Sequence, residues 1–140
     1  MGNGDAYAQI GYFYTLGEGV EKNDSLAFEN YKKAADLKSA NGALNLGVQY
    51  ILGSVTAKDL KEAEKWHIKA VEYGSAEAAW RLYTIYTNGD LFPKDEVKAE
   101  EFLQKALKAK HPEACCLMGY RYYLGKSVEK DNQQAFIYYK

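Results

Sequence analysis

A 36-residue period constrains the fold of this 140-residue chain more than any other feature. Proteins that repeat at this length stack supersecondary units side by side. The period predicts four units, at about 5–39, 40–75, 76–110 and 111–140, with the last one truncated. The columns filled in all four copies are Tyr14, Tyr50, Tyr86 and Tyr122; Gly17, Gly53, Gly89 and Gly125; Lys22, Lys58, Lys94 and Lys130; and Ala27, Ala63, Ala99 and Ala135.

Each unit has the pattern of two helices joined by a short loop. The stretch ALNLGVQYIL (43–52) spaces its apolar residues for a helix and stops at Gly53, a residue type that ends helices in the left-handed conformation. Asp59 is an N-cap residue type, and Asp59 with Glu62, like Asp131 with Gln134, resembles a capping box. The following EAEKWHIKAVEY (62–73) again has helical spacing. The predicted fold is therefore all-α: an α/α superhelix (solenoid) of helix-turn-helix repeats.

Small residues recur inside these helices. Gly11, Gly47 and Gly119 lie in mid-helix, where glycine costs about 1 kcal/mol relative to alanine. The repetition indicates that two backbones approach closely there, beside a stripe of small alanines on the second helix. Tyr83 takes the glycine position in unit three, where we expect the first helix to be displaced or rotated.

The glycines of GYFYTLGEGVEKND (11–24) raise the alternative of a phosphate-binding loop. Such a loop needs a preceding strand and a Lys-Ser or Lys-Thr pair on a following helix. The sequence has neither, so these glycines are interpreted as the boundary between two helices.

The sequence predicts no catalytic, cofactor-binding or metal-binding residues, and hence no enzyme. His67 is expected to be partly packed on a second helix, and His111, before Pro112, to be a solvated imidazole at a turn. Neither has partners at metal-ligand spacing. Cys115 and Cys116 are adjacent, so their side chains diverge by roughly 100° on a helix and cannot easily bond to each other.

Charge and hydropathy limit the classes of partner and the compartment that the sequence favours. The net charge of −1 gives no reason to expect nucleic acid or an anionic membrane. No apolar run reaches the length of a membrane span, and the first residues lack a signal-peptide pattern. We expect a cytoplasmic protein, while a periplasmic or secreted one remains open if a signal peptide was removed.

The segment AYAQIGYFYTLGEGVEKNDSLAFENYKKAADLKS resembles a SEL-1-like repeat, a relative of the tetratricopeptide repeat. The shared features are the paired alanines, the Ile10-Gly11 and Leu46-Gly47 pairs, the Gly-x-Gly-Val loop and the Tyr-Lys-Lys-Ala-Ala ending. Departures from the pattern lie at Val55-Thr56, Tyr83 and Ser127. The resemblance implies a superhelix that binds proteins or peptides and has no catalytic residues. Some members of the family also carry a cysteine pair in every unit; its absence here favours a reducing compartment.

By resemblance to tetratricopeptide arrays, the first helix of each unit lines the concave side and meets a protein or peptide partner. Trp80 and Leu44 are equally compatible with a place in the core, whereas tyrosines suit a surface that stays partly wet. The predicted protein-binding residues are Tyr12, Thr15, Asn41, Val48, Ile51, Glu77, Trp80, Thr84, Thr87, Tyr120 and Tyr123.

A second hypothesis is structural. Ala135, Phe136, Tyr138 and Tyr139 lie at the end of the chain with nothing following to cover them. The chain is then expected to be a segment of a longer solenoid, or to form a homodimer end to end through the C-terminal repeat.

Overall fold

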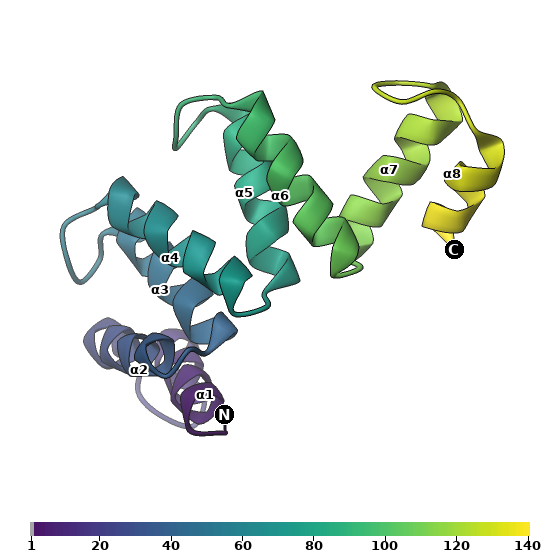
Figure 1. Cartoon of the computed structure of the whole chain (residues 1–140). Helices are drawn as coiled ribbons and strands as arrows, with labels where there is room; N and C mark the ends of the chain where they lie inside the picture. The colour runs from purple at the N-terminus through teal and green to yellow at the C-terminus, as the bar shows by residue number, and fades with distance from the viewer. Residues whose placement is uncertain (1) are drawn as a thin grey trace.

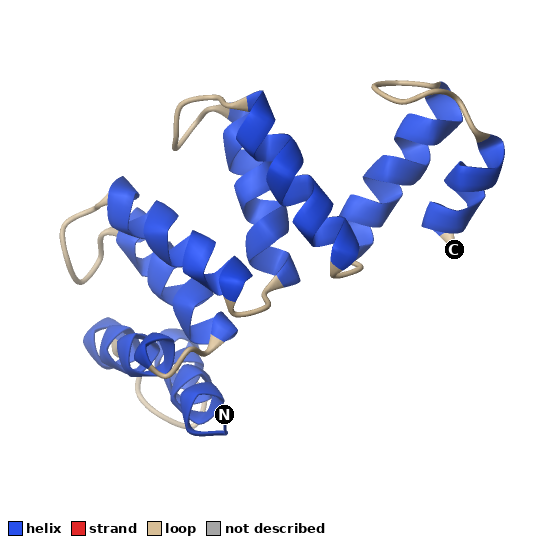
Figure 2. Cartoon of the chain, in the orientation of Figure 1, coloured by secondary structure: helices blue, strands red, loops and turns tan. Residues whose placement is uncertain are grey.

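Residues 2–140 are described by the structure, a computed structural model, and they form helices joined by loops and turns, with no strand among them (Figures 1 and 2). This confirms the all-α prediction. The helices pair into four antiparallel hairpins: α1 (Gly2–Leu16) with α2 (Asp24–Asp36), α3 (Ala40–Leu52) with α4 (Leu60–Glu72), α5 (Ala76–Asn88) with α6 (Glu96–Lys108), and α7 (Pro112–Leu124) with α8 (Asn132–Tyr139).

The four hairpins follow one another along an arc (Figure 1). In units two, three and four the loop that joins the two helices of a hairpin lies on the outer side of this arc, whereas the short turns α4–α5 and α6–α7 lie on its inner side (Figure 2). Neighbouring units contact mainly through the second helix of one and the first helix of the next. The chain is therefore an α/α solenoid.

The helix boundaries follow from the predicted capping residues. Gly53 adopts the left-handed conformation (φ 67°) and its N–H donates to the carbonyl of Gln49. The side chain of Asp59 accepts a hydrogen bond from the N–H of Glu62 at 3.1 Å. The N–H of Asp59 donates to the carbonyl of Tyr50 at 3.0 Å, in place of the Glu62 side chain that a capping box requires. The N-cap prediction is confirmed, and the capping-box interpretation is wrong in its reciprocal half.

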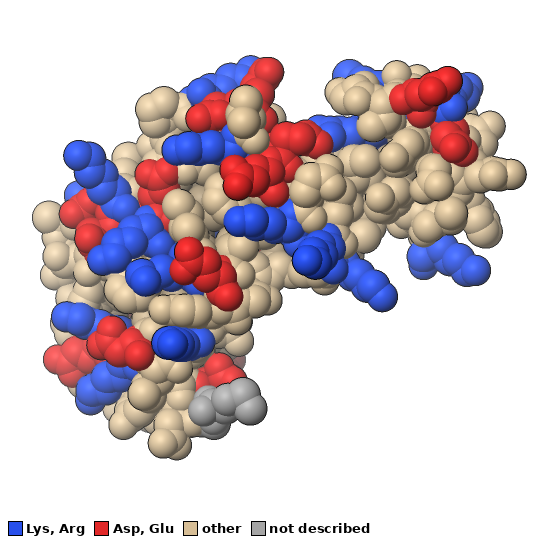
Figure 3. Space-filling view, viewed as in Figure 1, with Lys and Arg blue, Asp and Glu red and all other residues tan. Residues whose placement is uncertain are grey.

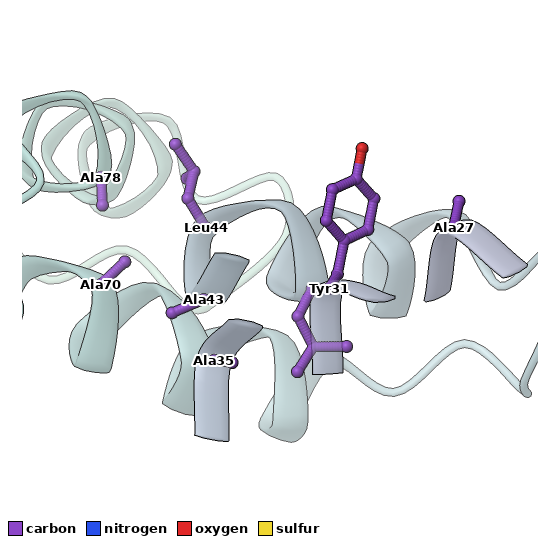
Figure 4. Packing of buried hydrophobic residues seen from close by; sticks show 8 residues of the cluster. Ala27, Tyr31, Ala35, Ala43, Leu44, Ala70 and Ala78 are labelled. Carbon is purple, nitrogen blue, oxygen red and sulfur yellow. The ribbon is translucent and has the colours of Figure 1, made fainter. Parts of the chain in front are cut away.

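The predicted alanine stripe lies in the core. The alanine column of all four second helices is buried, and so are the alanines seven residues further along in α2, α4 and α6. One buried cluster, the cluster of units one to three, contains Ala27, Tyr31 and Ala35 of α2, Ala43 and Leu44 of α3, Ala70 of α4 and Ala78 of α5 (Figure 4). A Cβ at Gly11 would lie 3.1 Å from the carbonyl oxygen of Ala27, and a Cβ at Gly42 would meet the Cβ of Ala34, so these small side chains let α2 lie close to both α1 and α3.

Each mid-helix glycine faces a ring on its partner helix. A Cβ at Gly11 would lie 2.8 Å from the ring of Tyr31, and a Cβ at Gly47 would lie 2.5 Å from Nδ1 of His67. Gly119 faces Tyr139 in the same way, with ring atoms at 3.0 Å. The close approach predicted from the glycine column is confirmed, and its cause is a ring that occupies the space of a Cβ.

Unit three reverses this arrangement. The glycine position holds Tyr83, and the ring position holds Leu103. Leu103 is fully buried in the cluster shared by units three and four, and Tyr83 packs against that cluster. The aromatic ring has moved from the second helix to the first. The displacement of α5 that we expect from Tyr83 stays a prediction.

His67 is more deeply packed than the sequence indicates. Its side chain is 1% exposed, and its Nδ1 lies 2.7 Å from the carbonyl oxygen of Ala63. Burial lowers the pKa of the imidazole, because the charged form loses its hydration.

Candidate protein-binding surface

The first and second helices differ sharply in charge. Helix α3 carries no charged residue, and α1 carries only Asp5. The second helices α2, α4 and α6 are rich in Lys and Glu, and Figure 3 shows charged side chains gathered over them while the visible parts of α7 and α8 are largely uncharged. Protein interfaces are typically depleted in Lys and Glu at their centre and enriched in aromatic residues. The first helices have this composition, and we call their non-core side the first-helix wall.

All eleven residues predicted to bind a partner lie on first helices, and none is fully buried. Among the eleven predicted residues, the tyrosines expose large aromatic side chains. Tyr12 on α1 is 47% exposed, and Tyr120 and Tyr123 on α7 are 51% and 56% exposed. A tyrosine held on a helix offers a large apolar area with a polar tip and loses little conformational entropy on binding.

The threonines of the set turn their hydroxyl groups inward. Thr15 Oγ1 lies 3.0 Å from the carbonyl of Gly11, to which it donates, and 2.9 Å from the hydroxyl of Tyr31. Thr84 and Thr87 donate to the carbonyls of Arg81 and Tyr83. These threonines therefore present mainly their methyl groups to a partner. Val48 and Ile51 on α3 are half-buried and apolar.

Leu44 and Trp80, which the sequence left equally compatible with the core, have different environments in the structure. Leu44 is buried in the cluster of units one to three and belongs to the core. Trp80 is half-buried and packs on the cluster shared by units three and four. Its indole stacks on His111 with ring centroids 5.5 Å apart and lies 5.1 Å from the ring of Tyr83. Trp80 is thus partly in the core and partly exposed.

Glu77 belongs to an ion-pair network that crosses from unit three to unit four. Its Oε1 accepts from Arg81 Nε at 2.9 Å, and its Oε2 lies 3.0 Å from His111 Nε2. The hydrogen bond with His111, aided by Arg81, lowers the pKa of the Glu77 carboxyl and keeps it ionised. The expectation of a solvated His111 is wrong: the residue is 6% exposed, because the turn that carries it packs against Trp80.

A polar groove of about 740 Å³ runs past the turns between the first three units. It includes Asn41 and Glu77 from the predicted set and also Asp5 and Ser39, which sequence reasoning missed. Ser39 Oγ donates to Asp5 Oδ1 at 2.9 Å, so the groove edge is built by contacts between units. The column Asp5, Asn41, Glu77 and Glu113 is a 36-residue repeat of polar residues and would have identified this edge.

None of the helices within residues 2–140 has the combined length and apolar character needed to cross a membrane.

The solved structures that match this chain include two at more than 30% identity. A Sel1 repeat protein from Oxalobacter formigenes is 35% identical with a TM-score of 0.79; the match covers 98% of this chain and 56% of that one. A protective antigen present in uropathogenic Escherichia coli strains, which displays an SLR fold, is 32% identical with a TM-score of 0.77; the match covers 99% of this chain and 30% of that one. This chain thus spans about half and about a third of their lengths.

Cysteine rich protein B of Helicobacter pylori is more distant, at 25% identity and a TM-score of 0.66, over 79% of this chain and 88% of that one. No curated protein sequence matches this chain significantly. The sequence profile of the Sel1 repeat family matches residues 4–39, 40–75, 76–111 and 112–140. Sel1-repeat proteins generally serve as scaffolds for protein–protein interactions and are typically non-catalytic. The four matched repeats cover nearly the whole chain, which therefore belongs to the Sel1-repeat family.

Proposed function

We propose that this chain is an adaptor that binds a protein or peptide along the first-helix wall. The observation that carries the proposal is the combination of few charges with exposed tyrosines at Tyr12, Tyr120 and Tyr123, on a solenoid whose second helices carry most of the charge. Such a wall gains affinity from apolar contact and from the hydroxyl tips of the rings. The predicted concave groove, with all eleven residues facing one partner, is part of this proposal.

The groove edge supports a partner that also makes polar contacts. Asp5, Asn41 and Glu77 place acceptor oxygens at one rim of the wall, at corresponding positions of three successive units. A bound segment that follows the solenoid would meet the same type of group once per repeat. The role is binding rather than catalysis. A reducing, cytoplasmic compartment suits the free thiols of Cys115 and Cys116.

The test compares two triple variants of the pure chain as bait in a cell extract. The wall variant carries Tyr12→Ala, Tyr120→Ala and Tyr123→Ala. The control carries Lys32→Ala, Lys61→Ala and Glu101→Ala, three exposed residues of the second helices. The same proteins should be retained by the unsubstituted chain and the control and lost by the wall variant, with circular dichroism showing all three folded.

Retention of the same proteins by the wall variant would refute the binding surface. Loss with both triple variants would also refute it, because binding would then depend on the charged face.

Self-association is a second candidate, favoured by the apolar surface of unit four. Phe136, Ile137 and Tyr139 are more than half exposed, and a groove of about 700 Å³ beside them is lined by Leu107 and Cys115 among others. A second copy would cover these side chains. Light scattering over a hundredfold concentration range should show association that Phe136→Lys abolishes and Val97→Lys, at an isolated exposed apolar residue of α6, leaves intact. A strict monomer throughout would refute this candidate.

A further inference from the structure

A pocket of about 420 Å³ lies between the start of α4 and the loop that joins α5 to α6, on the outer side of the arc (Figure 2). The apolar part of its lining is formed by Leu60, Tyr86, Leu91, Phe92 and Pro93. None of the eleven residues predicted to bind a protein partner lines it, so this pocket is distinct from the first-helix wall. Its volume suits a small organic molecule.

Phe92 gives this pocket an aromatic floor that the loops of the other units lack. The three equivalent loop positions hold smaller residues, Val20, Thr56 and Val128. Val20 is 40% exposed, whereas Phe92 is 5% exposed. The ring of Phe92 lies 5.7 Å from that of Tyr86, which in turn stacks on Phe102 at 6.0 Å. Packed rings therefore form the floor before any ligand binds.

Both carboxylates of the lining are already engaged by the protein. Glu64 accepts a hydrogen bond from the hydroxyl of Tyr86, and its Oε1 lies 4.0 Å from Nζ of Lys98. Burial, together with the neighbouring Glu64, raises the pKa of the Tyr86 hydroxyl, so Tyr86 remains the donor in this bond. Asp95 is the N-cap of α6 and accepts from the backbone N–H of Lys98 at 3.0 Å.

Three lysines also line the pocket, Lys61, Lys94 and Lys98, so three ammonium groups stand against two carboxylates. Among the ion pairs within residues 2–140, none involves Lys61. Nζ of Lys94 lies 3.5 Å from Oε1 of Glu96, an exposed residue that does not line the pocket. Lysines keep their ammonium groups in water while their stems lie on apolar surface. An anion at the mouth of the pocket would therefore meet positive charge directly beside an apolar floor.

We propose that this pocket binds a compact apolar group that carries one carboxylate. The apolar group lies against Phe92 and Tyr86, and the carboxylate meets the ammonium groups of Lys61 and Lys94. A free aromatic or branched aliphatic acid has this chemistry, and so has the last residue of a protein chain when its side chain is apolar. The site does not depend on what the first-helix wall binds.

Titrations of the pure chain, followed by the NMR signals of its backbone amides, test the site with matched probes. The first is 3-phenylpropionate, which should shift the signals of Leu60, Leu91 and Lys94 with a Kd of about 1 mM, as expected for a ligand of roughly eleven non-hydrogen atoms. The alcohol 3-phenylpropanol lacks the charge and acetate lacks the apolar group, so both should bind more weakly. N-acetylphenylalanine distinguishes the two sources: tighter binding than 3-phenylpropionate assigns the site to the end of a protein chain, and weaker binding assigns it to a free acid.

A double variant tests the role of the ammonium groups. Lys61→Met with Lys94→Met keeps both apolar stems and leaves Lys98 beside Glu64. It should bind 3-phenylpropionate about tenfold more weakly, since each exposed ion pair contributes up to about fivefold. The control, Lys32→Met with Lys126→Met, changes two exposed lysines of units one and four and should bind as the unsubstituted chain does. The proposal is overturned if 3-phenylpropionate does not bind at the pocket, if 3-phenylpropanol or acetate binds as tightly, or if the double variant keeps its affinity.

Discussion

Gly47→Ala tests the pairing of mid-helix glycines with rings. The added Cβ would lie 2.5 Å from Nδ1 and 2.7 Å from Cε1 of His67, and 3.2 Å from the carbonyl oxygen of Ala63. Carbon atoms pack at about 3.5–4.0 Å, so the overlap with the ring is about 1 Å. The ring has no room to withdraw, because it is buried and held against the Ala63 carbonyl at 2.7 Å.

Two opposing terms set the magnitude. Overpacking a rigid core site destabilises by about 1–3 kcal/mol, and an overlap of this depth belongs at the upper end. Alanine in place of a mid-helix glycine returns about 1 kcal/mol. The expected result is a loss of about 2 kcal/mol in the free energy of unfolding. Gly119→Ala is the matched control: its Cβ meets Tyr139 at 3.0 Å, but that ring is half exposed and can swing away, so the stability should change little.

Urea unfolding followed by circular dichroism and tryptophan fluorescence measures both variants, and Trp66 reports on α4, which carries His67. Solenoid units are coupled through their neighbours, so the two signals are compared before a two-state fit is used. Adding His67→Ala should abolish the loss caused by Gly47→Ala in a double-mutant cycle. A midpoint for Gly47→Ala equal to or above that of the unsubstituted chain would refute the ring-and-glycine explanation.

Four further predictions follow from contacts already described. Ala63→Leu should destabilise by about 1–3 kcal/mol by overpacking, and an unchanged urea midpoint would place Ala63 outside the helix contact. Asp59→Ala should cost about 1 kcal/mol by removing the α4 N-cap, whereas Asp90→Ala in an exposed loop should change stability little; equal effects would contradict the cap assignment. The lowered pKa of His67 means that the unfolded chain takes up this proton first, so stability should be constant above about pH 6.5 and decline below it. Urea titrations across this range should show that the free energy of unfolding declines as the pH falls, and His67→Leu should reduce this decline. A stability that rises as the pH falls would contradict the prediction. Binding of a partner protein should depend weakly on salt, since the net charge is −1; nucleic acid bound with a steep salt slope would contradict the adaptor role.

The sequence predicted best those features that the backbone alone decides. Gly53 and Asp59 have the expected capping conformations, because left-handed φ and N-cap geometry depend on the residue itself. The Ala63 column is buried as expected because helical spacing fixes which side of α4 faces its neighbours.

Features that depend on the partner helix were harder to predict. The glycine column indicated a close approach but did not name the ring that fills the space, although Tyr83 and Leu103 exchange bulk at the same two phases. His111 was expected in solvent because a proline and a turn surround it in the sequence. Its burial comes from Trp80, which lies 31 positions earlier and is brought beside it only by the stacking of units. The sequence predicted which helices carry the candidate site. It did not predict that Leu44 is buried in the core, because that burial depends on contacts with neighbouring units.

The bond that closes each outer loop makes those loops suitable for grafting. In every unit the loop begins at a glycine in the left-handed conformation and ends at an N-cap whose N–H donates to a tyrosine carbonyl, at 3.0–3.1 Å. The carbonyl belongs to the main chain, so the closure does not depend on the side chains between. Unit three shows this directly, since its loop carries Leu91, Phe92 and Pro93 and still closes at 3.1 Å. A foreign peptide inserted between Gly53 and Asp59 would start and end at fixed points on a rigid hairpin, so the solenoid could display such insertions at regular intervals along its outer edge.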